Sequence, residues 1–347
     1  MIREVYRTTV AAAALALAVG ATSGCTRPAA GDAGAKRWAE TRPLMGVSWT
    51  ITVAGIDEAP ARTAIAAAFA EVSRLERVLS DHDPASELSR LTARAPMPEA
   101  VPVGDDLWNV LERAAAIRDS TAGAFDVSVG PLTTLWRRAR RSARLPPPER
   151  LAAALAAVGP AAVELDPARR AVRLPLAGSR LDAGGIGMGY AADRALEVLA
   201  RHGATAAMID ASGDVVVSGP PPGTDGWRIA VDPLGRGGGR AAGTVIVLAH
   251  AAVTTSGDAR QFVEIDGRRY SHVVDPRTGL GVPGPAAATV VARDGTTADA
   301  LATAANVLGP EAGPPVIGRF PGAAALFTWQ DAQGGRHESA TAAWPTP

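Results

Sequence analysis

Hydrophobic and polar residues alternate along VSWTITV at positions 47–53, and this period of two predicts a half-buried strand. Asp57 follows as a helix cap. Apolar residues then recur every three or four positions, which predicts a long amphipathic helix over 59–79. Its buried face is expected to hold Ile65, Phe69, Val72, Leu75 and Leu79. A second helix is predicted from Asp106 to Arg118.

The rest of the chain mixes short strands with separate helices. A strand, a glycine-rich turn and a helix are predicted from Arg180 to His202, with Gly203 ending the helix. Helices are also predicted near 149–158 and over about 297–308. Strands are predicted near 162–174 and at 206–210, 214–218, 227–231, 244–249, 261–265 and 287–293. This mixture is typical of an α+β fold rather than a repeating βαβ fold.

Charge is balanced over the whole chain but clustered in one segment. The 35 Lys and Arg residues match 35 Asp and Glu residues, so there is no electrostatic reason to expect a nucleic-acid partner. Residues 131–150 contain RRARRSAR and PPP, and we interpret them as a solvated basic excursion between helices. The 347 residues are 47% hydrophobic and show no internal repeat, and we expect a single domain over 39–340.

The N-terminus has the pattern of a secretory signal. Arg3 and Arg7 precede the apolar stretch TTVAAAALALAVGA, and TSGC at 22–25 resembles the lipobox of bacterial lipoproteins. Acylation of Cys25, the only cysteine, would anchor an exported protein to the membrane on its periplasmic or other extracytoplasmic side. A buried cysteine inside a cleaved signal is the alternative. Residues 26–38 are expected to form a flexible spacer.

A glycine-rich junction in LDAGGIGMGYAADRA, residues 181–195, is the first candidate for chemistry. Bare backbone N–H groups and a helix N-terminus at such a junction can bind phosphate. A tight packing turn is the alternative. The glycine spacing does not fit the G-x-G-x-x-G fingerprint of dinucleotide-binding βαβ units. The glycines are Gly184, Gly185, Gly187 and Gly189.

TTADALATAANVLG, residues 296–309, is the second candidate. Asp299 and Thr303 are four positions apart, so a helix presents their carboxylate and hydroxyl on one face. Mg²⁺ prefers such hard oxygen ligands and usually takes only one or two carboxylates. An ordinary first-turn acid beside a solvent-facing threonine is the alternative.

YSHVVDPRTG, residues 270–279, is the third candidate. The DPRTG part predicts a tight turn, which places His272 at the end of a strand. A histidine titrates in the range that general-base catalysis needs. A structural histidine is the alternative, and Asp258 and Asp275 are the next candidates for the base.

These three segments occur in order with four others, and together they resemble the ApbE-like FAD:protein FMN transferases over roughly residues 40–330. The four others are PLMG at 43–46, SELSRL at 86–91, AFDVSVGPL at 124–132 and TSGD at 255–258. The resemblance implies a T-fold-related α+β domain that holds FAD in a cleft.

The resemblance also implies positions for the ligands. FAD contacts fall on Met45, His82, Ala124, Phe125, Asp126, Asp182, Met188 and Val274. Metal contacts fall on the carbonyl of Gly185 and the side chains of Asp299 and Thr303. The chain departs from the family in three places. The family often has Ala-Lys where this chain has Gly187 and Met188, some members have Asp at the position of Ala302, and some have Tyr at that of His82.

The implied reaction is Mg²⁺-dependent transfer of FMN from FAD to a Thr or Ser hydroxyl of an acceptor redox protein, with release of AMP. His272 is the hypothetical general base. Three alternatives stay open: a Mg²⁺-dependent FAD pyrophosphatase, a flavin-binding lipoprotein without turnover, and, more remotely, a Rossmann-type flavin oxidoreductase. Met188 in place of the family lysine is the main support for the second of these. Retention of Asp299 and Thr303 argues against it.

Overall fold

Alternating residues build the central sheet of the protein. The computed structural model describes residues 36–234, 244–259, 261–331 and 333–345, and in it β2 (Val47–Ala54) buries Trp49, Ile51 and Val53 completely. The described residues form an eight-stranded sheet in the order β1-β2-β6-β7-β10-β14-β15-β16, with every neighbouring pair antiparallel. The other strands of this sheet are β1 (Arg37–Leu44), β6 (Ala206–Ala211), β7 (Asp214–Val217), β10 (Ala251–Gly257), β14 (Ala286–Ala292), β15 (Ala324–Gln330) and β16 (Arg336–Ala340).

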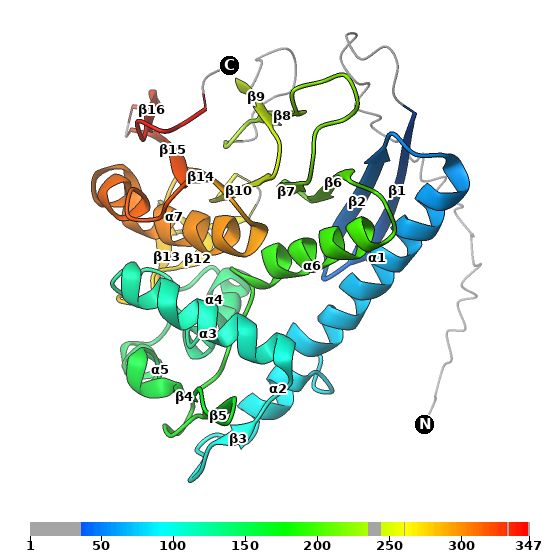
Figure 1. Ribbon diagram of the computed structural model, residues 1–347. Helices are drawn as coiled ribbons and strands as arrows, with labels where there is room; N and C mark the ends of the chain where they lie inside the picture. The colour runs from blue at the N-terminus through cyan, green and yellow to red at the C-terminus, as the bar shows by residue number, and fades with distance from the viewer. Residues whose placement is uncertain (1–35, 235–243, 260, 332, 346–347) are drawn as a thin grey trace, which may run out of the picture. The chain divides into compact units, whose positions relative to one another are not determined.

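Three long helices contribute to the main core on one face of this sheet: α1 (Glu58–Leu79), α6 (Gly187–Arg201) and α7 (Gly295–Ile317). In Figure 1, α6 passes between α1 and α7, in agreement with the contacts of α6 with both helices. The predicted apolar stripe of α1 is buried from Ile65 to Leu79. Asp57 precedes α1 as predicted, but its carboxylate pairs with Lys36 at 2.7 Å and makes no capping bond. Packing against the sheet therefore stabilises this helix more than its cap does.

The opposite face of the sheet is covered by a hairpin of β8 (Trp227–Val231) and β9 (Thr244–Leu248). Successive residues of β7 face opposite sides of the sheet. Val216 belongs to the core on the helix side, whereas Val215 and Val217 pack with the hairpin. Both faces are thus apolar, and the sheet forms the middle layer of an α+β fold, as predicted.

A third core lies between α4 (Gly130–Ser142), α5 (Pro148–Leu155) and the small sheet β11-β12-β13. Those strands are β11 (Phe262–Ile265), β12 (Arg268–Val274) and β13 (Gly281–Pro283). The remaining elements are α2 (Glu87–Thr92), α3 (Asp105–Ser120), a short 3₁₀ turn (Pro160–Ala162) and the sheet β3-β5-β4, formed by β3 (Val101–Pro102), β5 (Ala171–Arg173) and β4 (Glu164–Asp166).

The interpretation of residues 131–150 as a solvated excursion is wrong. Most of the RRARRSAR run belongs to α4, which buries Leu132, Trp136 and Ala139 against the small sheet. Only part of the charge faces solvent: Arg138 and Arg141 are exposed. The apolar residues recur at helical spacing between the arginines, and burial of Trp136 outweighs the polarity of the outer face.

Other elements differ from the prediction in extent. The segment near Arg180 makes one isolated parallel bridge with Val129 instead of a strand, and α7 runs to Ile317 with a break at Gly309. Six strands were not predicted, because they are too short, too polar or uniformly apolar: β1, β3, β10, β13, β15 and β16.

The predicted signal segment 1–25, including Cys25, lies outside the described residues, as does most of the predicted spacer 26–38. The last two residues of that spacer, Arg37 and Trp38, already belong to β1. No helix in the described ranges combines the length and hydropathy needed to cross a membrane.

Candidate active site

Helix α7 presents the two predicted metal ligands one turn apart. Asp294 caps this helix, and its carboxylate accepts hydrogen bonds from the N–H (2.7 Å) and the hydroxyl (2.6 Å) of Thr297. Asp299 and Thr303 follow on one face. Asp299 is only 3% exposed, whereas Thr303 is half-buried. The carboxylate therefore points into the protein and not into bulk water.

Glycines let the turn before α6 approach α7 closely. A Cβ atom on Gly189 would overlap the carbonyl oxygen of Gly295, so only glycine permits this helix crossing. The N–H of Gly189 donates to Oδ2 of Asp299 at 3.1 Å. A Cβ atom on Gly185 would lie 2.9 Å from Oγ1 of Thr303. The structure thus brings Gly185, Asp299 and Thr303 together, although the turn and α7 are 110 positions apart in the chain.

Among the described residues, no cationic side chain contributes to the shift in the pKa of Asp299. Burial raises the pKa of Asp299 to about 7, and the negative charge of Asp193 adds to this effect. The backbone N–H groups of Gly189 and Met188 oppose it because they stabilise the carboxylate. A cation bound next to Asp299 would supply the missing positive charge and favour the ionised form.

The oxygen atoms near Asp299 fit a hard divalent cation. A carboxylate, the Thr303 hydroxyl and the Gly185 carbonyl are ligands that Mg²⁺ accepts. Ser256 adds a further hydroxyl, 3.3 Å from that of Thr303. No group of three or more His, Cys, Asp or Glu side chains that could hold a metal occurs among the described residues. A Mg²⁺ ion here would fill its remaining positions with phosphate oxygens and water.

Asp214 at the start of β7 is a second, half-buried acid near this site. Burial raises its pKa well above the usual range, and the negative charges of Asp299 and Asp210 add to the shift. The backbone of Thr255 and the side chain of Thr254 oppose this shift in the pKa of Asp214. Sequence reasoning missed this residue. An acid at the head of the apolar strand DVVV, 214–217, was the available signal.

Three of the predicted flavin contacts lie around the glycine-rich turn. Asp182 accepts hydrogen bonds from the N–H of Gly184 (2.8 Å) and the hydroxyl of Thr133 (2.7 Å). The Phe125 ring comes within 3.3 Å of where a Cβ of Gly185 would lie. The Met45 methyl group is 3.9 Å from the equivalent point on Gly187. Asp182, Phe125 and Met45 thus surround the turn that was predicted to bind phosphate.

The other predicted flavin contacts are more dispersed. Asp126 accepts hydrogen bonds from the N–H (2.8 Å) and hydroxyl (2.7 Å) of Ser128, so its carboxylate orders its own loop. Ala124 is fully buried, and Met188 packs half-buried against the main core. Val274 is buried in the core formed by α4 and the small sheet. His82 has a side chain that is 72% exposed and lies 3.3 Å from Asp81.

Arg137 of α4 connects the loop of His82 to the glycine-rich turn. Its guanidinium pairs with Asp81 at 2.6 Å and with Asp182 at 3.1 Å. Arg180 donates to the backbone carbonyl of Asp81 at 2.6 Å. The arginine run that looked like a surface excursion therefore contributes directly to the site.

His272 on β12 is half-buried and held by the neighbouring chain. Its backbone N–H donates to the carbonyl of Gln261 at 3.0 Å, and its ring Nδ1 lies 3.3 Å from the same oxygen. A neutral ring that donates from Nδ1 leaves Nε2 free to accept a proton. Burial lowers the pKa of His272, and the positive charge of Arg140 lowers it further. The ring is therefore neutral near pH 7, as a general base must be.

The two alternative bases already have strong partners. Asp258 is fully buried, pairs with Arg269 and accepts the N–H of Ala286 at 3.0 Å. Asp275 pairs with Arg277 at 2.9 Å within the turn that follows β12. Both carboxylates are engaged in holding loops, which leaves His272 as the better candidate.

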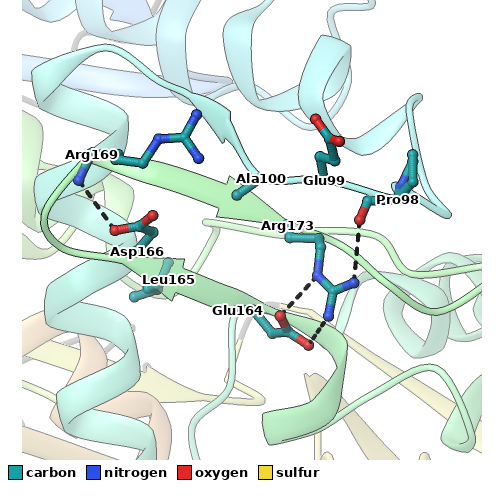
Figure 2. Close-up of a pocket in the computed structure, with 8 residues that line it drawn as sticks. All are labelled: Pro98, Glu99, Ala100, Glu164, Leu165, Asp166, Arg169 and Arg173. Carbon is teal, nitrogen blue, oxygen red and sulfur yellow. Dashed lines mark hydrogen bonds and ion pairs between the residues drawn. The ribbon is translucent and has the colours of Figure 1, made fainter.

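A surface pocket of about 470 Å³ lies at the small sheet β3-β5-β4. Figure 2 shows Arg173 bound to Glu164 and to the carbonyl of Pro98 on one side, and Asp166 bound to the N–H of Arg169 on the other. None of the predicted site residues lines this pocket. Glu164 and Arg173 pair with each other, and the pocket lies apart from every predicted flavin and metal contact, so we do not assign flavin chemistry to it.

Comparison with known proteins gives consistent matches over most of the chain. The model of the ApbE family matches residues 45–327. The FAD:protein FMN transferase of Treponema pallidum is 32% identical over 288 residues, which are 79% of each chain. The apo structure of the flavinyl transferase ApbE from Pseudomonas stutzeri aligns with a TM-score of 0.78 and 30% identity, covering 89% of this chain and 96% of that one. The ApbE protein of Thermotoga maritima aligns with a TM-score of 0.77 and 32% identity, covering 88% and 97%.

Proposed function

The chain belongs to the ApbE family and transfers FMN from FAD to an acceptor protein, and we propose that it does so with Mg²⁺ held by Asp299, Thr303 and the carbonyl of Gly185. The observation that carries this proposal is that Gly185 packs against Thr303, on the same face of α7 that carries the buried carboxylate of Asp299. When bound, Mg²⁺ would neutralise charge on the phosphate oxygens, which is the main requirement of phosphoryl transfer.

The proposed reaction exchanges one phosphorus–oxygen bond for another. A Thr or Ser hydroxyl of an acceptor redox protein attacks the FMN-side phosphorus of FAD, and the phosphoanhydride bond breaks. FMN becomes attached through a phosphoester, AMP leaves, and the hydroxyl proton passes to a base. Positioning dominates in chemistry of this kind. Helix α6 begins at Gly187, and the positive end of its dipole favours a phosphate bound beside it.

Intact mass of a candidate acceptor tests the proposal directly. The purified protein is incubated with FAD, Mg²⁺ and a redox protein that carries an exposed threonine. A mass gain equal to one FMN phosphoester, absent when EDTA replaces Mg²⁺, is the expected result. Free FMN and AMP without an adduct would show a pyrophosphatase instead. Bound FAD that stays intact would show a flavin carrier.

We expect His272→Ala to slow FMN transfer by about 10²- to 10⁴-fold while FAD binding stays unchanged, because the acceptor hydroxyl loses its base. The wild-type rate should be flat near pH 7 and fall as the pH drops through the pKa of His272, which lies below 6.5. His202→Ala, at the exposed end of α6, is the matched control. Full transfer activity in His272→Ala would contradict the assignment.

The chain is also proposed to be exported and anchored to the membrane through an acyl group on Cys25. The support is the sequence pattern, since residues 1–35 lie outside the described part. In cells fed a clickable fatty acid, the wild-type protein should carry the label and fractionate with membranes. Cys25→Ser should lose both properties because the chain has no other cysteine. Labelling that persists in the variant would contradict lipidation at this residue.

A further inference from the structure

One face of α4 connects the glycine-rich turn to the proposed base. Thr133, Arg137 and Arg140 are spaced four and three positions apart, so a helix places them in one row. The first two bind Asp182 at 2.7 and 3.1 Å. One turn further along, Arg140 donates to the side-chain oxygen of Gln261 at 3.3 Å, and the backbone carbonyl of Gln261 holds His272. The row thus runs from the predicted phosphate cradle to the base.

Arg140 differs from Arg137 because its charge is not compensated. Arg137 pairs with two carboxylates, whereas no described carboxylate forms an ion pair with Arg140. The Nε–H of Arg140 is buried without an acceptor in the described structure. Burial lowers the pKa of Arg140, and the nearby charge of Arg137 adds to the effect. A half-buried guanidinium in this state is costly unless an anion binds beside it.

We propose that Arg140 binds the FMN-side phosphate of FAD. This inference rests on the proposed function, because His272 can accept the proton of the attacking hydroxyl only if that phosphorus is close to it. Guanidinium groups match the geometry of phosphate oxygens and can bind two of them at once. The contact supplies a cationic group to a chain in which Met188 stands where the family often has lysine.

If Arg140 only stabilised the end of α4, its particular position on the helix would not matter. Arg140 is in the last turn of α4, where a positive charge favours the helix dipole. Arg141 is in the same turn, carries the same charge and is exposed to solvent. A dipole effect would therefore be shared by both residues, whereas a phosphate contact belongs to Arg140 alone.

The test measures the equilibrium binding of FAD, FMN and riboflavin to the protein. Binding is monitored by flavin fluorescence in the presence of Mg²⁺ and without acceptor. Arg140→Met is expected to bind FAD and FMN about 10- to 100-fold more weakly than wild type, and riboflavin unchanged. Arg140→Lys should recover part of the loss. Arg141→Met is the matched control and should bind all three flavins normally. The melting temperature of Arg140→Met should not fall, because the charge it removes is unpaired.

Each outcome separates this inference from the proposed function. If Arg140→Met matches Arg141→Met in FAD affinity, or loses FAD affinity but keeps that for FMN, the phosphate assignment is wrong even if wild type transfers FMN. If wild type binds FAD but yields no adduct on any acceptor, and Arg140→Met still loses FAD and FMN affinity, the transfer proposal fails and the phosphate contact stands. If wild type does not bind FAD at all, both fail.

Discussion

Replacing Asp299 with asparagine is expected to lower the rate of FMN transfer by about 10³-fold or more, which corresponds to roughly 4 kcal/mol of transition-state stabilisation. The substitution keeps the size of the side chain and an oxygen that can accept the N–H of Gly189. It removes the only negative charge among the three proposed Mg²⁺ ligands. The measurement is the rate of adduct formation by intact mass over a range of Mg²⁺ concentrations.

The Asp299→Asn variant is expected to lose activity without losing stability. The pKa of Asp299 is raised from 3.8 to about 7 in the folded protein without bound metal, so stability is lost as the pH rises from about 4 to 7, and above 7 the full cost of the buried charge remains. The asparagine side chain would be neutral at every pH, and the variant should melt no lower than metal-free wild type at pH 8. Low activity together with a lower melting temperature would indicate a damaged fold instead of a lost ligand.

Asp294→Asn is the matched control for this experiment. It makes the same chemical change five positions earlier, at the cap of α7, where asparagine is also a good capping residue. Near-normal transfer is expected. If Asp299→Asn transferred FMN as fast as Asp294→Asn at every Mg²⁺ concentration, the proposed metal site would be wrong.

Gly189→Ala is expected to destabilise the protein by about 3 kcal/mol or more and to abolish FMN transfer. The added Cβ would overlap the carbonyl oxygen of Gly295 and lie 2.9 Å from Cβ of Asp299. The carbonyl oxygen of Gly295 belongs to the backbone and cannot turn aside, so α6 and α7 must separate. Substitutions that overpack a core in this way are among the more destabilising single changes. The free energy of unfolding is measured by urea denaturation, with circular dichroism as the readout.

Gly187→Ala, two positions earlier in α6, is the stability control. Its Cβ would meet Leu79, Ala183 and Met45 at 3.6 to 3.9 Å, which are ordinary van der Waals distances. Alanine also favours the helix over glycine, so a change within about 0.5 kcal/mol, or a small gain, is expected. Equal stabilities for the two variants would contradict the close crossing of α6 and α7.

Local patterns predicted much of the fold because their physical basis is local. The apolar stripe of α1 and the alternation in β2 follow from the geometry of one element. The same patterns failed where two signals competed. In α4, the arginines suggested solvent, while the helical spacing of Leu132, Trp136 and Ala139 indicated a buried face. In β15, AALFTWQ is apolar from its first residue and has no period of two, so nothing local distinguished it from a helix.

The sequence by itself determined the α+β class, the family and the placement of Asp299 and Thr303 on one helix face, because four-residue spacing acts within a single turn. Only the tertiary structure decided that Gly185 lies beside Thr303, that the negative charge of Asp214 lies near Asp299, and that Arg140 lies near His272. These relations depend on distances between elements that are far apart in the chain. Burial and Coulomb interactions act through space, and no spacing along the sequence encodes them.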